Sequence, residues 1–295
     1  MSEPQVSVYL PTRNRAGLLR EAAESVLAQH WRELELIIVD DASEDETPEV
    51  AESLARRDPR VRYLRQSMPG GAPAARNRAI AEARGRFVTG IDDDDLMLPG
   101  RLAALLQAHD ERHALVCSGF LLERGGWRKP MFASAREIDL NRLLYMNIVG
   151  NQALVLTERV RAIGGFDENL VASQDYDLWT RLVAQFGPAR RIAGPSYVVR
   201  QDAAPESISA SPRAGQGAAQ YAVKHAALMN AAQRRSQWLL QAIASRQPLR
   251  LVDFPAGFAA PTASLLLRYW LAGLPAAERL QQRYRRLRWG LRAGS

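Results

Sequence analysis

Cysteine is nearly absent from this 295-residue chain, which has only Cys117. One thiol excludes a disulfide framework and fits a reducing compartment, and its place in the apolar run ALVCSGF predicts a buried, inert side chain. The start of the chain, MSEPQVSVYLPTRN, lacks the basic segment and the long apolar core of a signal peptide. We therefore expect a cytoplasmic protein.

Two glycine-rich phosphate-binding signatures are also missing. No GxGxxG follows the first expected strand, which disfavours a dinucleotide fold of the dehydrogenase type, and the lack of GxxxxGK[ST] excludes a P-loop. The apolar stretch ASLLLRYWLAGLP is short and contains Arg268, which argues against a membrane span. The 47% hydrophobic content suffices for one substantial core and a second small one.

Positive charge is concentrated in the last third of the chain. The formal net charge is +7, yet residues 215–295 carry one Lys and eleven Arg against Asp253 and Glu278, a net charge of +10. The preceding body is therefore slightly acidic. A basic tail on an acidic body predicts that the tail binds an anionic surface.

Strand and helix patterns alternate along the first 91 residues. The expected strands are 6–10, 34–39, 61–64 and 87–91, and the expected helices are 16–29, one that opens at Thr47-Pro48, and 74–83. This order predicts an α/β fold with a mostly parallel central sheet and helices on both faces. Ligands of such folds bind at the carboxyl ends of the strands.

Polar residues gather at those strand ends. Residues 12–15 follow the first strand, residues 40–41 the second, and four consecutive aspartates, 92–95, follow the fourth in FVTGIDDDDLMLP. Alternation puts Asp92 and Asp94 on one face, roughly 6–7 Å apart, where they can share one divalent ion. Few hard oxygen ligands favour Mg²⁺ or Mn²⁺ with a phosphate completing the shell. A solvated acidic turn or a calcium loop is the alternative for DDDD alone.

Residues 6 to about 200 resemble the family 2 glycosyltransferases, which have a GT-A fold and invert the anomeric centre. The matching segments, in the family's order, are VSVYLPTRNR, IIVDDAS, GGAPAARNRAI, FVTGIDDDDLMLPGRL, GGFDENL and QDYDLWTRL. Each alone is a weak signal, whereas six in order are a strong one. The resemblance predicts a GT-A catalytic domain at 1–202, with a nucleotide-sugar half at about 1–99 and an acceptor half at about 100–202.

The resemblance also implies roles for the residues at matching positions. The implied nucleotide-sugar-binding residues are Pro11, Thr12, Arg13, Asp41, Arg76, Asp92 and Asp93. Among them, Asp41 would accept a hydrogen bond from a nucleobase N–H, and Arg76 would lie against the ribose and diphosphate. Asp92 and Asp94 take the positions of the family's DxD pair and would hold Mn²⁺ or Mg²⁺, which stabilises the departing nucleoside diphosphate.

Asp175, in QDYDLW, matches the carboxylate that acts as general base on the acceptor hydroxyl. Such a base must lie opposite the leaving group. The chain has Gln174 where the family usually has Glu, so we expect altered electrostatics around Asp175. An alternative role for Asp175 is to cap the helix that follows, and the two roles are compatible.

Trp127, Asn151 and Gln152 lie where the acceptor side of such enzymes is usually built. Trp127 follows two glycines, so it is either an exposed platform for a sugar ring or a core residue. Both alternatives stay open at this point.

The alternation stops after residue 202. We expect a linker at 203–217 and a helical basic region at 218–295, with helices at 220–243 and 276–292. Amphipathic helices with aromatic and Arg side chains fit peripheral binding to the inner face of the cytoplasmic membrane. The alternative is that they pack on the catalytic domain and expose a solvated basic face.

The resemblance, together with the basic tail, thus implies a metal-dependent inverting hexosyl- or deoxyhexosyltransferase. It would move a sugar from a UDP- or dTDP-sugar to a hydroxyl of a glycan or glycolipid, in lipopolysaccharide or other envelope polysaccharide synthesis. The expected partners are the donor, the acceptor and an anionic membrane surface; a homodimer is allowed for, and no nucleic acid is expected. The alternatives are a non-catalytic protein whose tail binds anionic lipid or nucleic acid, and a nucleotidyltransferase.

Overall fold

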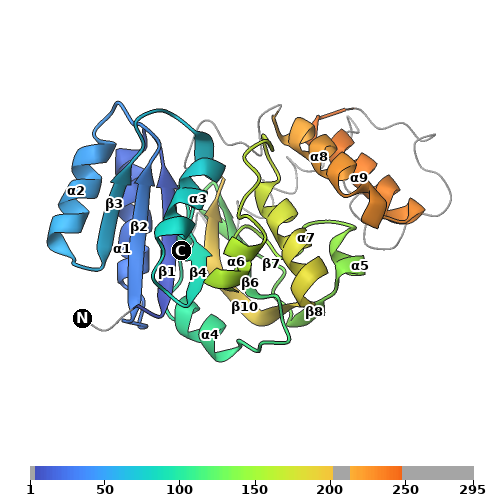
Figure 1. The fold of residues 1–295 in the computed structure, drawn as a ribbon, viewed down its shortest axis with the longest axis horizontal. Coiled ribbons are helices and arrows are strands. Elements are labelled where there is room, and N and C mark those ends of the chain that lie inside the picture. Colours follow the sequence, from blue (N-terminus) through green and yellow to red (C-terminus); the bar gives the residue numbers. More distant parts are fainter. Residues whose placement is uncertain (1–3, 202–212, 248–295) are drawn as a thin grey trace, which may run out of the picture.

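The computed structural model describes residues 4–201 and 213–247 (Figure 1). Its first elements are β1 (Val6–Thr12), α1 (Ala16–Leu27), β2 (Leu34–Asp40), α2 (Thr47–Arg57), β3 (Val61–Arg65), α3 (Gly71–Glu82) and β4 (Phe87–Gly90). Each strand and helix expected in the first 91 residues is present. Helix α3 begins three residues before the expected position, because Asp41 accepts hydrogen bonds from the N–H groups of Gly70 and Gly71 and so caps it.

The first sheet has the strand order β3-β2-β1-β4-β9, in which β9 (Val155–Leu156) is antiparallel to β4 and the other pairs are parallel. Successive side chains of β1 point to opposite faces. Val8 and Leu10 pack in the core that contains α1 and α2, whereas Tyr9 packs in the core that contains α3. Helices therefore cover both faces, and the predicted α/β fold is confirmed.

A second, mixed sheet lies beyond β4 and has the order β5-β10-β6-β7, with β8 also paired to β10. Its strands are β5 (Leu96–Met97), β6 (Leu115–Arg124), β7 (Trp127–Met131), β8 (Arg136–Ile138) and β10 (Ala189–Arg200). The helices of this part are α4 (Arg101–Gln107), α5 (Leu140–Leu143), α6 (Thr157–Ala162) and α7 (Gln174–Phe186). The sheet is mixed because β10 runs parallel to β6 and antiparallel to β5 and β8.

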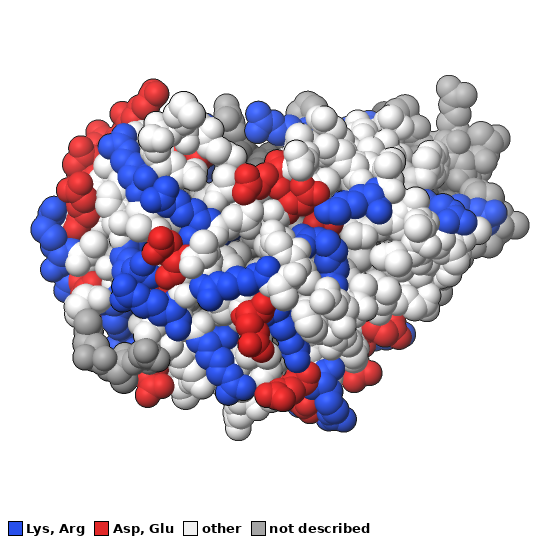
Figure 2. Space-filling model, in the orientation of Figure 1, with Lys and Arg blue, Asp and Glu red and all other residues white. Residues whose placement is uncertain are grey.

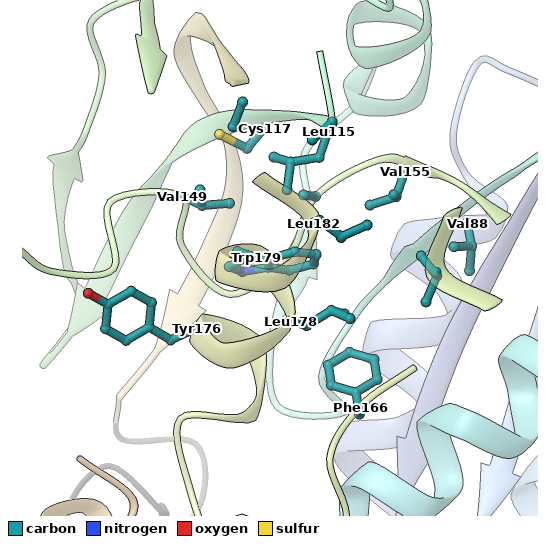
Figure 3. Close-up of a cluster of buried hydrophobic side chains, with 14 of the residues drawn as sticks. Val88, Leu115, Cys117, Val149, Val155, Phe166, Tyr176, Leu178, Trp179 and Leu182 are labelled. Carbon is teal, nitrogen blue, oxygen red and sulfur yellow. The ribbon is translucent and has the colours of Figure 1, made fainter. Parts of the chain in front are cut away.

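Helix α7 is fixed by its apolar side. Figure 3 shows Trp179 in the cluster of buried side chains to which Cys117 and Val149 also belong. Trp179 is fully buried, and its indole N–H donates to the carbonyl oxygen of Gly150 at 2.9 Å. The expected burial of Cys117 is therefore confirmed, and α7 cannot shift without breaking this packing.

The chain beyond the second sheet differs from the prediction. Instead of one helix at 220–243, α8 (Arg213–Lys224) and α9 (Ala231–Ala244) lie side by side next to α7 (Figure 1). Asn230 and Gln233 form a reciprocal capping box that starts α9 and separates the two helices. Residues 213–217 of the expected linker belong to α8, and the helix expected at 276–292 lies outside the described residues.

A membrane-crossing helix was not expected. None of the helices in the described part of the chain is long and apolar enough to cross a bilayer.

Gly90 ends β4 directly before the aspartates, and its lack of a side chain is required. A Cβ at this position would lie 1.9 Å from Cε2 of Tyr9 and 2.4 Å from Oε1 of Gln152. We expect Gly90→Ala to lower the free energy of unfolding by about 1–3 kcal/mol, measured by chemical denaturation. Gly17→Ala in α1 is the control, because its Cβ would meet no atom within 4 Å. Equal stability of the two variants would contradict this packing.

Candidate active site

The ends of β1 and β4 bring the first predicted site residues together. Pro11 and Thr12 are the last residues of β1 and are buried, and Arg13 follows them at the exposed edge. The hydroxyl of Thr12 donates to Oδ2 of Asp93 at 2.8 Å. Thr12 therefore supports the aspartate loop from within, and Arg13 is the member of this group that faces solvent.

The four aspartates alternate in exposure, with Asp92 and Asp94 half-buried and Asp93 and Asp95 buried. Nη1 of Arg15 lies 2.7 Å from Oδ1 of Asp93 and 3.1 Å from Oδ2 of Asp94. Burial and the charges of Asp92 and Asp93 nevertheless raise the pKa of Asp94 to about 6. The loop thus remains short of positive charge, which favours binding of a cation.

Asp92 is contacted from two other elements. Nη2 of Arg76, on α3, lies 2.7 Å from Oδ1 of Asp92, and the Arg76 guanidinium lies over the ring of Phe166 at 5.3 Å. Gln152 donates to the same Asp92 oxygen at 3.3 Å and accepts from the hydroxyl of Tyr9 at 2.9 Å. Gln152, which was expected on the acceptor side, is buried and contacts the aspartate loop instead.

Asp175 is the second residue of α7, whose N-cap position is occupied by Ser173. The alternative role of Asp175 as the helix cap is therefore wrong. Burial raises the pKa of Asp175 to about 6, although the backbone N–H of Tyr176, the charge of Arg76 and a hydrogen bond from Asn147 act to lower it. A half-buried carboxylate with this pKa is ionised at neutral pH and can still accept a proton readily.

Asn147 holds the Asp175 carboxylate from a neighbouring loop. Its Nδ2 donates to Oδ2 of Asp175 at 2.9 Å, and its Oδ1 accepts from the N–H groups of Val149 and Gly150, each at 3.2 Å. These backbone contacts fix the Asn147 amide, so that its N–H faces Asp175. The loop that follows Asn147 includes Gln152, so one loop contacts both Asp175 and Asp92.

Three other predicted residues have different surroundings. Asp41 is buried and accepts from the N–H groups of Gly70 at 2.6 Å and Gly71 at 2.9 Å, so its carboxylate supports the start of α3. Trp127 begins β7 and is 44% exposed, which excludes the core role considered for it. No described contact joins Trp127 to the aspartates. Asn151 is half-buried, next to Gln152.

The metal expected at the aspartates needs few protein ligands. Within residues 4–201 and 213–247, no group of three or more His, Cys, Asp or Glu side chains is arranged to hold a metal. Two carboxylates, Asp92 and Asp94, suit an ion such as Mg²⁺ or Mn²⁺ that completes its shell with phosphate oxygens and water. The raised pKa of Asp94, which follows from burial and neighbouring carboxylates, fits this donor set.

Several residues of the site were not predicted. Arg15 belongs to the polar loop after β1, and Phe166 to the GGFDENL segment, so the sequence indicated both segments without indicating the contacts. Asn147 lies in no matching segment and carries no periodic signal. It reaches Asp175 only because α7 packs against the loop at Gly150.

Comparison with known proteins decides the family. The model of "Glycosyl transferase family 2" matches residues 7–164, which is more than half of the chain. The chain is a family 2 glycosyltransferase. The matched region contains the aspartate loop and Arg76, and Asp175 lies just beyond it.

Similar sequences and structures agree with this assignment. The putative colanic acid biosynthesis glycosyl transferase WcaA of Escherichia coli K12 is 33% identical over 246 residues, which cover 80% of this glycosyltransferase and 86% of WcaA. A GalNAc(5)-diNAcBac-PP-undecaprenol beta-1,3-glucosyltransferase of Campylobacter jejuni is 40% identical over 124 residues, 42% of this chain and 40% of that protein.

Among solved structures, TarS 1–349 of S. aureus has a TM-score of 0.64 at 18% identity, covering 92% of this chain and 81% of TarS. The mannosyltransferase PcManGT of Pyrobaculum calidifontis has a TM-score of 0.60 at 20% identity, covering 96% and 84%. These likenesses show that the fold is of the GT-A type.

The raised pKa of Asp175 predicts a pH-dependent cost in stability. Because the pKa is about 6 in the folded state and about 3.8 when unfolded, the folded protein holds the proton more tightly, and stability falls as the pH rises through 6. Asp175→Asn removes this cost while keeping an acceptor for Asn147. We expect the variant to be more stable than the wild type at pH 8 by about 1–2 kcal/mol, after allowance for solvent screening.

Thermal unfolding at pH 8 and pH 4 measures this difference, which should shrink at the lower pH. Asp167→Asn is the control, and we expect it to lower stability at pH 8, because a hydrogen bond from Lys224 lowers the pKa of Asp167. An Asp175→Asn variant that is less stable than the wild type at pH 8 would contradict the raised pKa.

Proposed function

We propose that this protein is a metal-dependent inverting glycosyltransferase that moves a sugar from a nucleoside-diphosphate donor to an acceptor hydroxyl. The observation that carries the proposal is the placement of Arg76, which forms an ion pair with Asp92 at 2.7 Å and lowers the pKa of Asp175 by its charge. The Arg76 guanidinium thus links the aspartate loop to Asp175, a carboxylate that can act as a base.

The donor is a nucleotide sugar of the UDP or dTDP class, bound along the ends of β1, β2 and β4. Arg13 and Asp41 are the residues for the nucleobase, and one oxygen of Asp41 retains an acceptor site beyond its bonds to the α3 loop. Arg76 and Asp92 are the residues for the diphosphate and ribose. Solved complexes of the structural neighbours, TarS with UDP-GlcNAc and PcManGT with GDP-Man and Mn²⁺, support a nucleotide-sugar donor and a divalent cation.

Asp175 acts as the general base. It takes the proton of the acceptor hydroxyl, whose oxygen attacks the anomeric carbon on the side opposite the diphosphate. The bond from the anomeric carbon to the phosphate oxygen breaks, and its electron pair leaves with the nucleoside diphosphate, so a single displacement inverts the configuration. Asn147 keeps the carboxylate oriented for this transfer.

Arg76 contributes positive charge where the diphosphate departs. A divalent cation held by Asp94 and Asp92 supplies further stabilisation of the negative charge on the leaving group when it is bound. Thr12 and Arg15 hold the Asp93 carboxylate, which keeps the aspartate loop in place for Arg76 and for the divalent cation.

The acceptor that we propose is a glycan or glycolipid of the bacterial envelope, with Asn151 and Trp127 on the acceptor side. The names of the relatives support this, because one refers to colanic acid biosynthesis and the other to an undecaprenol-linked glycan. Such acceptors favour peripheral binding at the inner face of the membrane through the basic C-terminal region. On the face drawn in Figure 2, the α8–α9 end is mostly uncharged, with scattered basic side chains.

Loss of the base tests the proposal. A thermal-shift screen of UDP-, dTDP- and GDP-sugars with MnCl₂ selects the donor, and slow transfer to water is measured as release of nucleoside diphosphate. Asp175→Asn should lower kcat about 100- to 10,000-fold while leaving the thermal shift by the donor unchanged. In the wild type, kcat should fall below pH 6, because the base is then protonated.

Glu49→Gln, which neutralises an exposed carboxylate on α2, is the matched control and should keep wild-type kcat. Turnover by Asp175→Asn close to that of the wild type would overturn the assignment of the base.

A further inference from the structure

The residues that directly follow Asp175 on α7 are held by α8 rather than by the two sheets. Asp177 is fully buried, and its oxygens lie 2.7 Å from Nη2 of Arg181, 2.8 Å from Nζ of Lys224 and 2.8 Å from Nε2 of His225. Although burial acts to raise it, hydrogen bonds from these three side chains hold the pKa of Asp177 well below its ordinary value. Two of the three partners come from the end of α8 and the residue after it.

Tyr176 is fixed from the same side. Its ring stacks on that of Tyr221 in α8, with centroids 3.8 Å apart and planes at 14°. Its hydroxyl donates to the carbonyl oxygen of Leu143 at 2.6 Å and accepts from Nε2 of Gln237 in α9 at 2.9 Å. Both residues after Asp175 therefore depend on the C-terminal helices for their position.

Helix α8 also holds the segment that supports Arg76. Lys224 contacts Oδ2 of Asp167 at 2.6 Å, and the side chain of Gln220 bonds to the backbone of Asn169 and Val171. This segment includes Phe166, whose ring lies under the Arg76 guanidinium. Residues 166–171 form this segment, which we call the Phe166 segment. Lys224 thus bridges the Phe166 segment and the first turn of α7.

We propose that α8, through Lys224, positions both Asp175 and the Phe166–Arg76 pair, and that it is part of the catalytic unit. The inference rests on the proposed role of Asp175 as the base. The helix lies beyond the region matched by the family model, which ends at residue 164, so the family match does not include it. In the sequence, this part was expected to be partly linker.

The physical reason lies in the burial of Asp177. A buried carboxylate must be paired, and loss of Lys224 leaves Asp177 with Arg181 and His225 alone among the described residues. Displacement of the first turn of α7 toward solvent would offset the lost contact. The hydrogen bond from Asn147 acts to lower the pKa of Asp175. Such a displacement moves Asp175 away from Asn147, so the pKa of Asp175 should rise. Misplacement of a base by about 1 Å can cost on the order of 100-fold in rate, whereas the nucleotide residues at the ends of β1 and β4 stay in place.

The test compares Lys224→Met with Arg235→Met. Both substitutions remove one positive charge, but Arg235 is exposed on α9, and within the described residues no hydrogen bond or ion pair joins it to α7 or to the Phe166 segment. Release of nucleoside diphosphate from the donor selected by the thermal-shift screen is measured with MnCl₂ as a function of pH. We expect Lys224→Met to lower kcat about 10- to 100-fold and to move the acid limb of the kcat profile to higher pH. Lys224→Arg should restore both.

The outcomes distinguish this inference from the proposed function. Wild-type kcat and an unshifted pH profile in Lys224→Met, beside an inactive Asp175→Asn, would overturn the positioning role alone. Turnover by Asp175→Asn at the wild-type rate would overturn the base itself. If Lys224→Met does not fold, Lys224→Gln, which can still donate to Asp177 without a charge, gives the same comparison, and a loss of kcat no larger than in Arg235→Met contradicts the inference.

Discussion

Four consecutive carboxylates meet at the end of β4, and the rest of the site depends on how their mutual repulsion is offset. Three arginines from different elements approach them: Arg15 from the loop after β1, Arg76 from α3, and Arg200 from the end of β10, which bonds to the loop through its side chain and its backbone N–H. Burial and the neighbouring carboxylates nevertheless raise the pKa of Asp94, and for this reason we propose the loop as the site of a further cation. Repulsion among the four carboxylates costs stability in the free protein, and a bound cation would relieve it.

Asp175, the proposed base, is separated from this loop in the sequence and joined to it through packing. Arg76 forms an ion pair with Asp92 and lowers the pKa of Asp175, while one loop contacts Asp92 through Gln152 and Asp175 through Asn147. Helix α7 carries Asp175 and is fixed on one side by the buried Trp179, whereas α8 contacts its other side. The position of Asp175 therefore depends on contacts from both sheets and from the C-terminal helices.

Much of this could be predicted from local patterns. The apolar runs of β1 to β4 alternate with helical segments, and parallel strands end at the same edge, so the aspartates had to lie near the loop after β1. The contacts of Asn147 and Lys224 could not be predicted, because they join residues 28 and 47 positions from their partners through tertiary packing that has no local period. The break between α8 and α9, by contrast, had a readable signal in the capping pair Asn230 and Gln233.

The central claim is that the aspartate loop binds a divalent cation together with a nucleoside diphosphate. Thermal unfolding with UDP, dTDP or GDP, each with MnCl₂ or with excess EDTA, tests it most directly in the wild type and in Asp94→Asn. We expect one nucleotide at about 100 times its Kd with Mn²⁺ to add about 2.7 kcal/mol of stability, and both EDTA and Asp94→Asn to remove most of this gain. An equal gain in EDTA, or in Asp94→Asn with Mn²⁺, would contradict the account.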